Sequence, residues 1–290
     1  MLKNSFNPPK KNNLSKDYVC HDTFEKVLII GADSHLGIAL KNRLSYKKIN
    51  VFGTTRRKRN INHNTYLLDL EKTDFEIPIQ KYTSAIFCAA TTNIAECEKD
   101  PHKHKKINVT NTLKLIEKLV ANNIFVIYLS SNSVFNGEKE FYKYDEKTSP
   151  NNKYGKFKTE VEEYLINKLA SKSCILRLTK VITKETPFIQ NWNNEANQGK
   201  PIKTFINKFL SPVGIEDALD AIELLIKCKQ SGIYQLGGRK EFSYTEYAKH
   251  IYKDFPKVLA LISELVYLDS EKRFIHNSLS TNMHKRRSNL

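Results

Sequence analysis

From residue 26 onward, short apolar runs alternate with segments of helix length, and this alternation limits the possible folds more than any other feature. The runs hold few polar residues, which is typical of strands that are buried on both faces of a sheet. The expected strands lie at 26–30, 50–54, 65–68, 84–88, 124–129 and 174–178. Three expected helices lie at 35–46, 101–121 and 153–170. Strands that alternate with helices predict an α/β protein, in which right-handed crossovers cover both faces of a parallel sheet.

The chain divides by composition into three regions. Residues 1–24 are polar and contain two consecutive prolines, which predicts a flexible basic arm. Residues 25–180 hold the alternating runs and form the main domain, whereas residues 181–290 are mixed and loop-rich. Three further elements are expected in this last region, a helix at 215–228, a strand at 232–236 and a helix at 244–255. We expect it to form a smaller C-terminal lobe, partly interleaved with the main domain, that completes a cleft at the carboxyl ends of the strands and finishes in a basic tail.

The formal net charge of +16 raises the question of an anionic partner. Such a charge can serve binding to nucleic acid or to an anionic membrane. Here the lysines are spread along the whole chain, and no nucleic-acid-binding module is present. We therefore interpret the charge as a solvated basic surface that attracts an anionic small molecule, and we expect neither nucleic acid nor membrane as a partner.

Apolar length and cysteine usage bear on the compartment. No stretch approaches the roughly 18 to 20 apolar residues of a membrane span, and the first residues lack the apolar core of a secretory signal. The cysteines form no CxxC pair and are odd in number. They are Cys20, Cys88, Cys97, Cys174 and Cys228. This pattern predicts scattered reduced thiols in a cytoplasmic protein.

The segment GADSHLG follows the first apolar run and precedes the first expected helix. In a doubly wound, Rossmann-type sheet this turn brings backbone N–H groups and a helix N-terminus against a pyrophosphate. Gly31 permits the tight turn, and Gly37 lets the helix pack closely on the sheet. Ser34 stands where such turns usually carry a third glycine, but its hydroxyl could donate a hydrogen bond to a phosphate oxygen. We expect a dinucleotide to contact this turn, including His35 and Leu36.

The end of the second expected strand bears on which dinucleotide binds. Sites that prefer NADH usually place an acidic residue there for the ribose 2′-hydroxyl, whereas a cationic residue accommodates a 2′-phosphate. Here Arg56 and Arg57 follow Thr55, and no acidic residue is present. The sequence therefore predicts NADPH, with NADH possible.

Tyr154 and Lys158 are one helical turn apart in the third expected helix. A free tyrosine, with a pKa near 10, transfers protons poorly at neutral pH, and a neighbouring ammonium group would lower that pKa. Ser131 ends the preceding strand and could hydrogen-bond the same substrate oxygen. A second YxxxK pair begins at Tyr164, about 80° around the helix, and we expect that tyrosine to pack or face solvent.

Eight blocks between residues 26 and 238 resemble, in the same order, the extended short-chain dehydrogenase/reductases that act on nucleotide sugars. The resemblance is closest to the dTDP-4-dehydrorhamnose reductase group. The blocks are GADSHLGIAL, LDLEKTD, CAATTNIAECEKDP, INVTNTLKLIEKL, LSSNSVFNGEK, SPNNKYGKFKTEVEEYL, ILRLTKVI, and KFLSPVGIEDALDAI with GIYQLGG. The resemblance implies a Rossmann-type NAD(P)-binding domain, a substrate-binding lobe and a nucleotide-sugar substrate.

The resemblance also implies roles for individual residues. Ser131, Tyr154 and Lys158 would be catalytic, and the last two would also contact the cofactor. Asp69 and Leu70 would lie along the adenine, and Ala89 and Ala90 beside a ribose of the cofactor. Four more residues would form the framework or shape the cleft, namely Arg177, Pro212, Glu216 and Asp217. One departure stands out, because the family usually has threonine, aspartate and tyrosine where this chain has Ser131 and the next two residues, Asn and Ser.

No metal site is expected, because His102 and His104 are two residues apart and would point away from each other on a helix. Trp192, the only tryptophan, either packs in the smaller lobe or stacks on the substrate.

Three functional hypotheses follow. The first is an NADPH-dependent reductase of a nucleotide-activated 4-keto-6-deoxy sugar, which serves surface polysaccharide precursor synthesis and could act as a homodimer. The second is an epimerase or dehydratase that retains NAD⁺. The third is a catalytically silent, cofactor-binding regulatory subunit, because the resemblance extends to a regulatory subunit of methionine adenosyltransferase.

Overall fold

The structure is a computed structural model that describes residues 26–72, 76–79, 82–268 and 276–283. The predicted arm at residues 1–24 and the end of the predicted basic tail lie outside the described residues.

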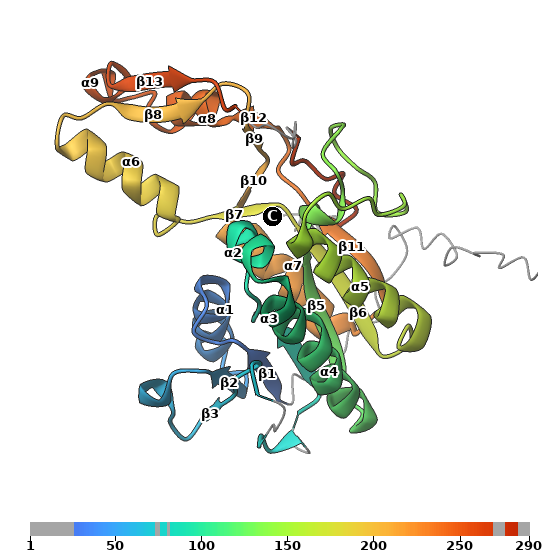
Figure 1. Ribbon diagram of the computed structural model, residues 1–290. Coiled ribbons are helices and arrows are strands. Elements are labelled where there is room, and N and C mark those ends of the chain that lie inside the picture. Colours follow the sequence, from blue (N-terminus) through green and yellow to red (C-terminus); the bar gives the residue numbers. More distant parts are fainter. Residues whose placement is uncertain (1–25, 73–75, 80–81, 269–275, 284–290) are drawn as a thin grey trace, which may run out of the picture.

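Seven parallel strands form one sheet at the centre of the molecule (Figure 1). Their order in space is β11-β6-β5-β4-β1-β2-β3. The strands are β1 (Val27–Ile30), β2 (Val51–Thr55), β3 (Thr65–Leu67), β4 (Ser84–Phe87), β5 (Phe125–Ser131), β6 (Ser173–Leu178) and β11 (Gly232–Leu236). The chain runs outward from β1 to β3 and then crosses to β4 on the other side of β1. This reversal opens a crevice beyond the carboxyl ends of β1 and β4, where doubly wound α/β proteins bind ligands.

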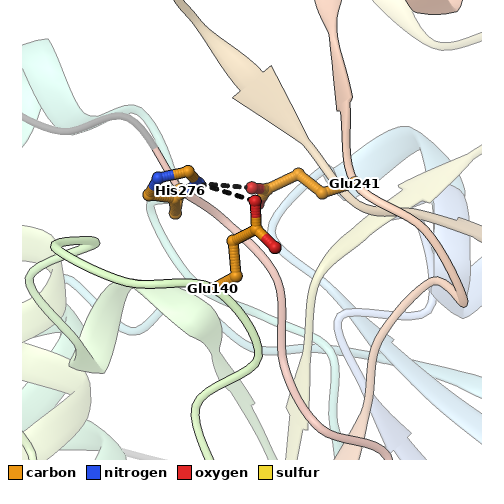
Figure 2. Close-up of side chains that lie close together, drawn as sticks. All are labelled: Glu140, Glu241 and His276. Carbon is orange, nitrogen blue, oxygen red and sulfur yellow. Dashed lines mark hydrogen bonds and ion pairs between the residues drawn. The ribbon is translucent and has the colours of Figure 1, made fainter.

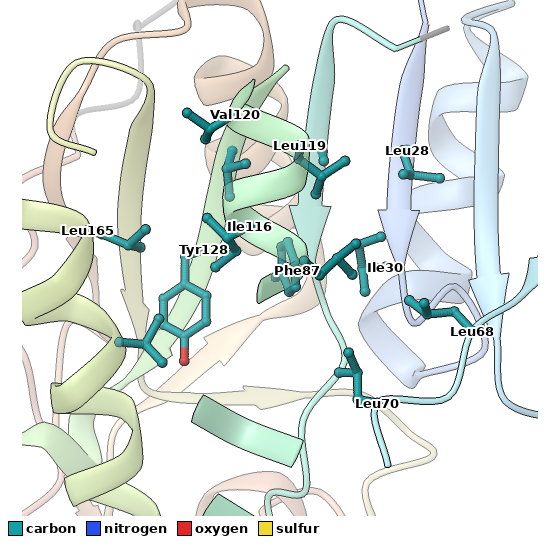
Figure 3. Packing of buried hydrophobic residues seen from close by; sticks show 14 of the residues in the cluster. Leu28, Ile30, Leu68, Leu70, Phe87, Ile116, Leu119, Val120, Tyr128 and Leu165 are labelled. Atoms are coloured by element: carbon teal, nitrogen blue, oxygen red, sulfur yellow. The ribbon is translucent and has the colours of Figure 1, made fainter. Parts of the chain in front are cut away.

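Helices cover both faces of the sheet, so the predicted doubly wound fold is confirmed. They are α1 (His35–Tyr46), α4 (Thr112–Ala121), α5 (Lys153–Lys168) and α7 (Ile215–Cys228). On one face, Leu40 of α1 and Ile222 of α7 are fully buried in a single apolar cluster. On the other, Ile116 of α4 and Leu165 of α5 pack with the strand residue Tyr128 (Figure 3). Each such aliphatic side chain contributes about 1.5–3 kcal/mol to folding.

The helix expected at 101–121 is divided. It consists of α3 (Pro101–Lys105), a π-helical stretch η3 (Lys106–Asn111) and α4, and the unexpected α2 (Ile94–Lys99) precedes it. Two side-chain hydrogen bonds explain the wider turn. The Thr112 hydroxyl donates to the Ile107 carbonyl, five residues back, at 2.8 Å, and Asn111 donates to the Leu70 carbonyl at 2.7 Å. Periodicity alone does not reveal such a change of helix type.

The smaller lobe stands beyond the carboxyl ends of the sheet strands (Figure 1). Its elements are α6 (Pro187–Asn197), β8 (Ile202–Phe205), β9 (Phe209–Leu210), β12 (Phe242–Ser243), α8 (Tyr244–Ile251), α9 (Pro256–Leu259) and β13 (Ile262–Leu265). Strands β8 and β13 pair in parallel, whereas β9 and β12 are antiparallel. Trp192 is a core residue of this lobe, 3 % exposed, with its ring edge-on to Phe188. Of the two roles considered for Trp192, packing is the one that this geometry supports.

The parallel pair β7 (Lys180–Ile182) and β10 (Pro212–Gly214) lies between the sheet and the lobe (Figure 1). The segment 276–283, which we call the C-terminal strap, also contacts both parts of the molecule. Leu279 of the strap packs against Val134 and Phe135, and the Asn282 side chain accepts a hydrogen bond from the backbone of Gln235 in β11 at 2.6 Å.

The cysteines differ from expectation in one respect. Cys88, Cys97 and Cys174 are free thiols, whereas Cys228 is disulfide-bonded. Spacing along the chain did not indicate this bond, because spacing does not report which thiols meet in space. Within the described residues, none of the helices combines the length and the apolar character that crossing a membrane requires.

Candidate active site

The GADSHLG turn lies directly after β1, and its two glycines are required by close contacts. Gly31 has a φ of +82°, and a Cβ there would lie 2.8 Å from the Cβ and backbone nitrogen of Ala89. A Cβ on Gly37 would lie 2.4 Å from the Gly31 carbonyl oxygen. Any side chain at either position would therefore push α1 or the end of β4 away from the turn.

Ser34 takes an ordinary extended conformation, with φ −76° and ψ 159°, so the missing third glycine causes no strain. It is the N-cap of α1, and its hydroxyl oxygen accepts a hydrogen bond from the Gly37 N–H at 3.0 Å. The hydroxyl proton remains able to donate to a ligand. His35 is exposed and Leu36 is half-buried.

A cavity of about 400 Å³ lies at the carboxyl ends of β1, β2 and β4. Most of the expected cofactor residues line it, namely Gly31, Ser34, Thr55, Arg56, Asp69, Leu70, Ala89 and Ala90. His35, Leu36 and Gly37 belong to the adjoining first turn of α1, whereas Tyr154 and Lys158 belong to α5, and none of these five expected residues lines the cavity. The structure thus brings together side chains from the glycine turn, the end of β2 and the end of β4.

The wall of this cavity includes residues that sequence reasoning missed. The carboxylate of Asp33 accepts a hydrogen bond from the Thr55 hydroxyl at 2.9 Å and lies 3.7 Å from the Arg57 guanidinium. His104 is only 8 % exposed, and within the described structure its Nδ1 atom is buried without a hydrogen-bond partner. The position of Asp33 inside the glycine turn could have indicated its place in the cavity wall, whereas no sequence pattern indicated the place of His104.

The proposed catalytic side chains meet where β5 ends against the start of α5. Ser131 is the last residue of β5, and Tyr154 and Lys158 lie in the first half of α5. A Cβ on Gly155 would lie 1.9 Å from the Ser133 carbonyl oxygen, so glycine alone lets α5 approach the chain beyond β5 this closely. This requirement was also missed, although the glycine stands directly after Tyr154.

Burial controls the ionisation of Tyr154 and Lys158. It raises the pKa of Tyr154 well above that of a free phenol, while a hydrogen bond with Ser131 acts in the opposite direction. Burial also lowers the pKa of Lys158 to about 8, opposed by the nearby Glu162 and Cys88. The expected lowering of the tyrosine pKa by Lys158 is therefore wrong for this structure. Desolvation disfavours the charged form of both groups, and the Lys158 ammonium donates instead to the Leu129 carbonyl at 2.8 Å.

The loop after Ser131 is η4 (Asn132–Val134), and the C-terminal strap holds it. The Ser131 hydroxyl hydrogen-bonds the side chains of Asn132 and Ser133, each at 3.2 Å. The Asn132 side chain donates in turn to the side chain of Asn277 in the strap at 2.7 Å, and Asn277 donates to the carbonyl of Phe209 in the smaller lobe at 2.8 Å. Ser131 is therefore linked to the lobe through two asparagines.

Beside this linkage, the Nδ1 atom of His276 in the strap faces the carboxylates of both Glu140 and Glu241 (Figure 2). The three side chains include ligand types that metal ions use, and their ligand atoms lie within 4.8 Å of one another. However, the His276 Nδ1 atom is 2.6 Å from a Glu241 oxygen, closer than the about 3.3 Å that separates two ligands around a tetrahedral zinc ion. The arrangement is a direct histidine–carboxylate contact.

Two further expectations concern residues outside the catalytic group. Arg177 is 2 % exposed, and it pairs with the buried Glu162 at 2.7 Å and donates to the Gln235 side chain at 3.1 Å. This buried pair joins α5 to β6 and β11, as a framework residue should. Tyr164 hydrogen-bonds Glu117 at the surface, away from Ser131.

A family model described as the RmlD substrate binding domain matches residues 25–287. Two curated relatives are similar over shorter stretches. The spore coat polysaccharide biosynthesis protein SpsK of Bacillus subtilis is 25 % identical over 240 residues, which are 82 % of this chain and 82 % of that protein. Methionine adenosyltransferase 2 subunit beta of Rattus norvegicus is 30 % identical over 142 residues, which are 49 % of this chain and 42 % of that protein.

Two solved structures share the fold. A hypothetical dTDP-4-dehydrorhamnose reductase from Sulfolobus tokodaii has a TM-score of 0.76 and 25 % identity, covering 88 % of this chain and 92 % of that chain. The dTDP-4-dehydrorhamnose reductase of Bacillus anthracis, in complex with NADP, has a TM-score of 0.75 and 22 % identity, covering 90 % and 91 %.

The doubly wound sheet, the glycine turn and the Ser–Tyr–Lys group define an extended short-chain dehydrogenase/reductase of the nucleotide-sugar type. Because the family model spans all the described residues, this protein belongs to the RmlD substrate-binding domain family. The resemblance drawn from the eight sequence blocks is thereby confirmed.

Proposed function

We propose that this protein is an NADPH-dependent reductase of a nucleotide-activated 4-keto-6-deoxy sugar, and that it serves the synthesis of a surface polysaccharide precursor. One observation carries the proposal. The hydrogen-bonded pair of Ser131 and Tyr154 stands beside Lys158 at the end of β5, and Cys88, which lines the cavity behind the glycine turn, lies near Lys158. Similarity to dTDP-4-dehydrorhamnose reductases and to a spore coat polysaccharide protein supports the substrate class.

The cavity suits a dinucleotide. Gly31, which packs so closely on Ala89 that a Cβ has no room, forms part of the cavity wall with Ser34, and Ser34 caps the N-terminus of α1 there, which is the part of a helix that favours a pyrophosphate. Asp69 and Leu70 line the part of the wall expected to hold the adenine. Arg56 and its neighbour Arg57 supply positive charge for a 2′-phosphate. When bound, NADPH supplies the hydride that reduces the keto carbon.

The side chains at the end of β5 then supply the proton that the reduction needs. Reduction of a ketone needs an acid, and Tyr154, whose pKa burial raises, remains protonated at neutral pH and donates to the forming alkoxide. The Ser131 hydroxyl can hold the same oxygen. Lys158 is charged below a pH of about 8, and its positive charge stabilises the negative charge that develops there.

Substitution of Tyr154 tests the proposal. In Tyr154→Phe the proton donor is lost while the cavity is unchanged, so turnover should fall about 100-fold or more. The NADPH dissociation constant, measured by nicotinamide fluorescence, should stay within about twofold. Tyr164→Phe is the matched control, because the Tyr164 hydroxyl hydrogen-bonds the surface residue Glu117. This variant should behave as wild type. Unchanged turnover in Tyr154→Phe would refute the assignment.

The substrate is identified by NADPH oxidation across dTDP-, UDP- and GDP-linked 4-keto-6-deoxy sugars. The 30 % identity to a methionine adenosyltransferase subunit supports a second candidate, a silent cofactor-binding subunit. If NADPH binds, no keto sugar is reduced and a partner protein co-purifies, this second function replaces the first.

An NAD⁺-retaining epimerase or dehydratase is a weaker candidate. Dehydratases need an acid–base pair near the serine, whereas the side chains that hydrogen-bond Ser131 are those of Asn132, Ser133 and Tyr154, and none of them is a carboxylic acid. An absorbance spectrum of the purified protein that shows stoichiometric NAD⁺ would favour this class instead.

A further inference from the structure

The Asp33 carboxylate lies where the second strand ends, although it belongs to the glycine turn. Its Oδ2 atom accepts the hydrogen bond of the Thr55 hydroxyl at 2.9 Å, and Thr55 is the last residue of β2. The Thr55 oxygen also accepts a hydrogen bond from the Arg57 N–H at 3.0 Å. These bonds fix the carboxylate against the start of the loop that holds Arg56 and Arg57. The Asp33 side chain is 23 % exposed and lines the cavity, so a ligand can reach it.

The end of β2 is where a dinucleotide site reads the 2′ position of the adenosine ribose. An acid there accepts a hydrogen bond from the 2′-hydroxyl of NADH, but it repels the doubly charged 2′-phosphate of NADPH. The sequence pattern showed only positively charged residues at the end of the second strand, whereas the folded chain places a negative charge there as well, that of Asp33. Arg57 is itself partly engaged, because its guanidinium lies 3.7 Å from the same Asp33 oxygen.

We propose that Asp33 is a specificity-determining residue, which weakens the binding of NADPH relative to NADH and lets the enzyme also use NADH. The carboxylate accepts the ribose 2′-hydroxyl of NADH. The 2′-phosphate of NADPH must compete with the Asp33 carboxylate for the Arg57 guanidinium. This inference rests on the proposed function, because it assumes that the cavity holds a nicotinamide dinucleotide.

The substitution Asp33→Asn isolates the charge. Asparagine keeps the size of the side chain and can still accept the Thr55 hydrogen bond, so the turn should fold as before. We expect the ratio of NADH to NADPH dissociation constants to rise at least tenfold, through tighter NADPH and weaker NADH binding. Arg57→Gln should move the ratio in the opposite direction.

Glu71→Gln is the matched control. It removes one negative charge from the same cavity wall, but Glu71 pairs with Lys103 at 3.2 Å and is not bonded to the end of β2. It should leave the ratio within about twofold. The fragments 2′,5′-ADP and 5′-AMP differ only in the 2′-phosphate, and calorimetric titration with both should show the same pattern without the nicotinamide.

These are binding measurements, so they do not depend on which sugar is the substrate. If wild-type protein binds neither dinucleotide, the proposed function fails. If it binds both and Asp33→Asn leaves the ratio unchanged, or if Glu71→Gln shifts it equally, the assignment of Asp33 is overturned while the proposed function stands.

Discussion

The cavity behind the glycine turn and the end of β5 are built by different means. At the cavity, main-chain geometry dominates, since Gly31 and Gly37 are fixed by backbone contacts, and Ser34 replaces a glycine without strain. At the end of β5, the proposed chemistry depends on the buried side chains of Tyr154 and Lys158, whose pKa values burial shifts in opposite directions. The shape of the glycine turn should therefore tolerate changes of side chain that leave the backbone in place, whereas the proposed chemistry at the end of β5 should not.

Among the substitutions considered, Gly155→Ala should have the largest effect on both stability and turnover, because it acts at the end of β5. The new Cβ would lie 1.9 Å from the Ser133 carbonyl oxygen, so α5 must move away from the loop that follows Ser131. We expect a loss of about 3 kcal/mol in the free energy of unfolding, measured by urea denaturation. Turnover should fall by orders of magnitude, while the folded fraction still binds NADPH with nearly wild-type affinity.

A glycine with room around it provides the control. At Gly214 a Cβ would meet only a side-chain oxygen of Asp217, at 3.4 Å, so Gly214→Ala should cost no more than about 1 kcal/mol as a change of N-cap residue. Equal losses in the two variants would mean that close approach of α5 does not decide the effect.

Lys158→Met is expected to have the next largest effect. Measurements of stability at several pH values should show it. Burial lowers the pKa of Lys158 to about 8 from its usual 10.5. Below pH 8 the lysine is protonated in both the folded and the unfolded chain, so the cost of burying its charge is fully present. Between pH 8 and 10.5 the unfolded chain binds more protons, so stability rises with pH until this cost is gone. Relative to wild type, the variant should thus be more stable at pH 7 than at pH 10.5, by roughly 3 kcal/mol.

Turnover of the wild type should also decline as the pH rises through about 8, where Lys158 loses its charge, and Lys158→Met should lack both this decline and most of the activity. Lys156→Met, at an exposed position of the same helix, should match wild type in both measurements. A stability difference that does not vary with pH would contradict the buried-charge account.

Substitutions of Ser34 should have the smallest effects. Ser34→Ala removes the N-cap hydrogen bond of α1 and should cost about 1 kcal/mol, whereas Ser34→Gly should cost only a few tenths. Both should weaken NADPH binding slightly or leave it unchanged, with little effect on turnover at saturating NADPH. Strongly tighter binding by Ser34→Gly would show that the serine obstructs the phosphates.

Much of this arrangement was predictable because it depends on local sequence. Apolar runs indicated the strands, and the glycine turn needed only the residues between β1 and α1. The Ser131, Tyr154 and Lys158 group was found because family resemblance supplied a context that the YxxxK spacing lacks. The structure places these three residues together, and their catalytic roles stay predictions.

What escaped prediction arises from contacts between distant segments. Asp33 reaches the end of β2 only because β1 and β2 are neighbours in the sheet, so a reading of the second strand alone found no acid. The shifts of Tyr154 and Lys158 follow from burial, which the helix pattern did not quantify. The π-helical stretch before α4 depends on a hydrogen bond between Thr112 and Ile107, two residues whose pairing periodicity does not reveal.

The C-terminal strap has a consequence for the order in which the protein matures during synthesis. The loop beyond Ser131 is held by Asn277, and Leu279 completes the small apolar cluster with Val134 and Phe135. A nascent chain can form the sheet through β6 long before these residues leave the ribosome. Its glycine turn can therefore exist on the translating ribosome, whereas the loop after Ser131 is held in place only after the strap has emerged.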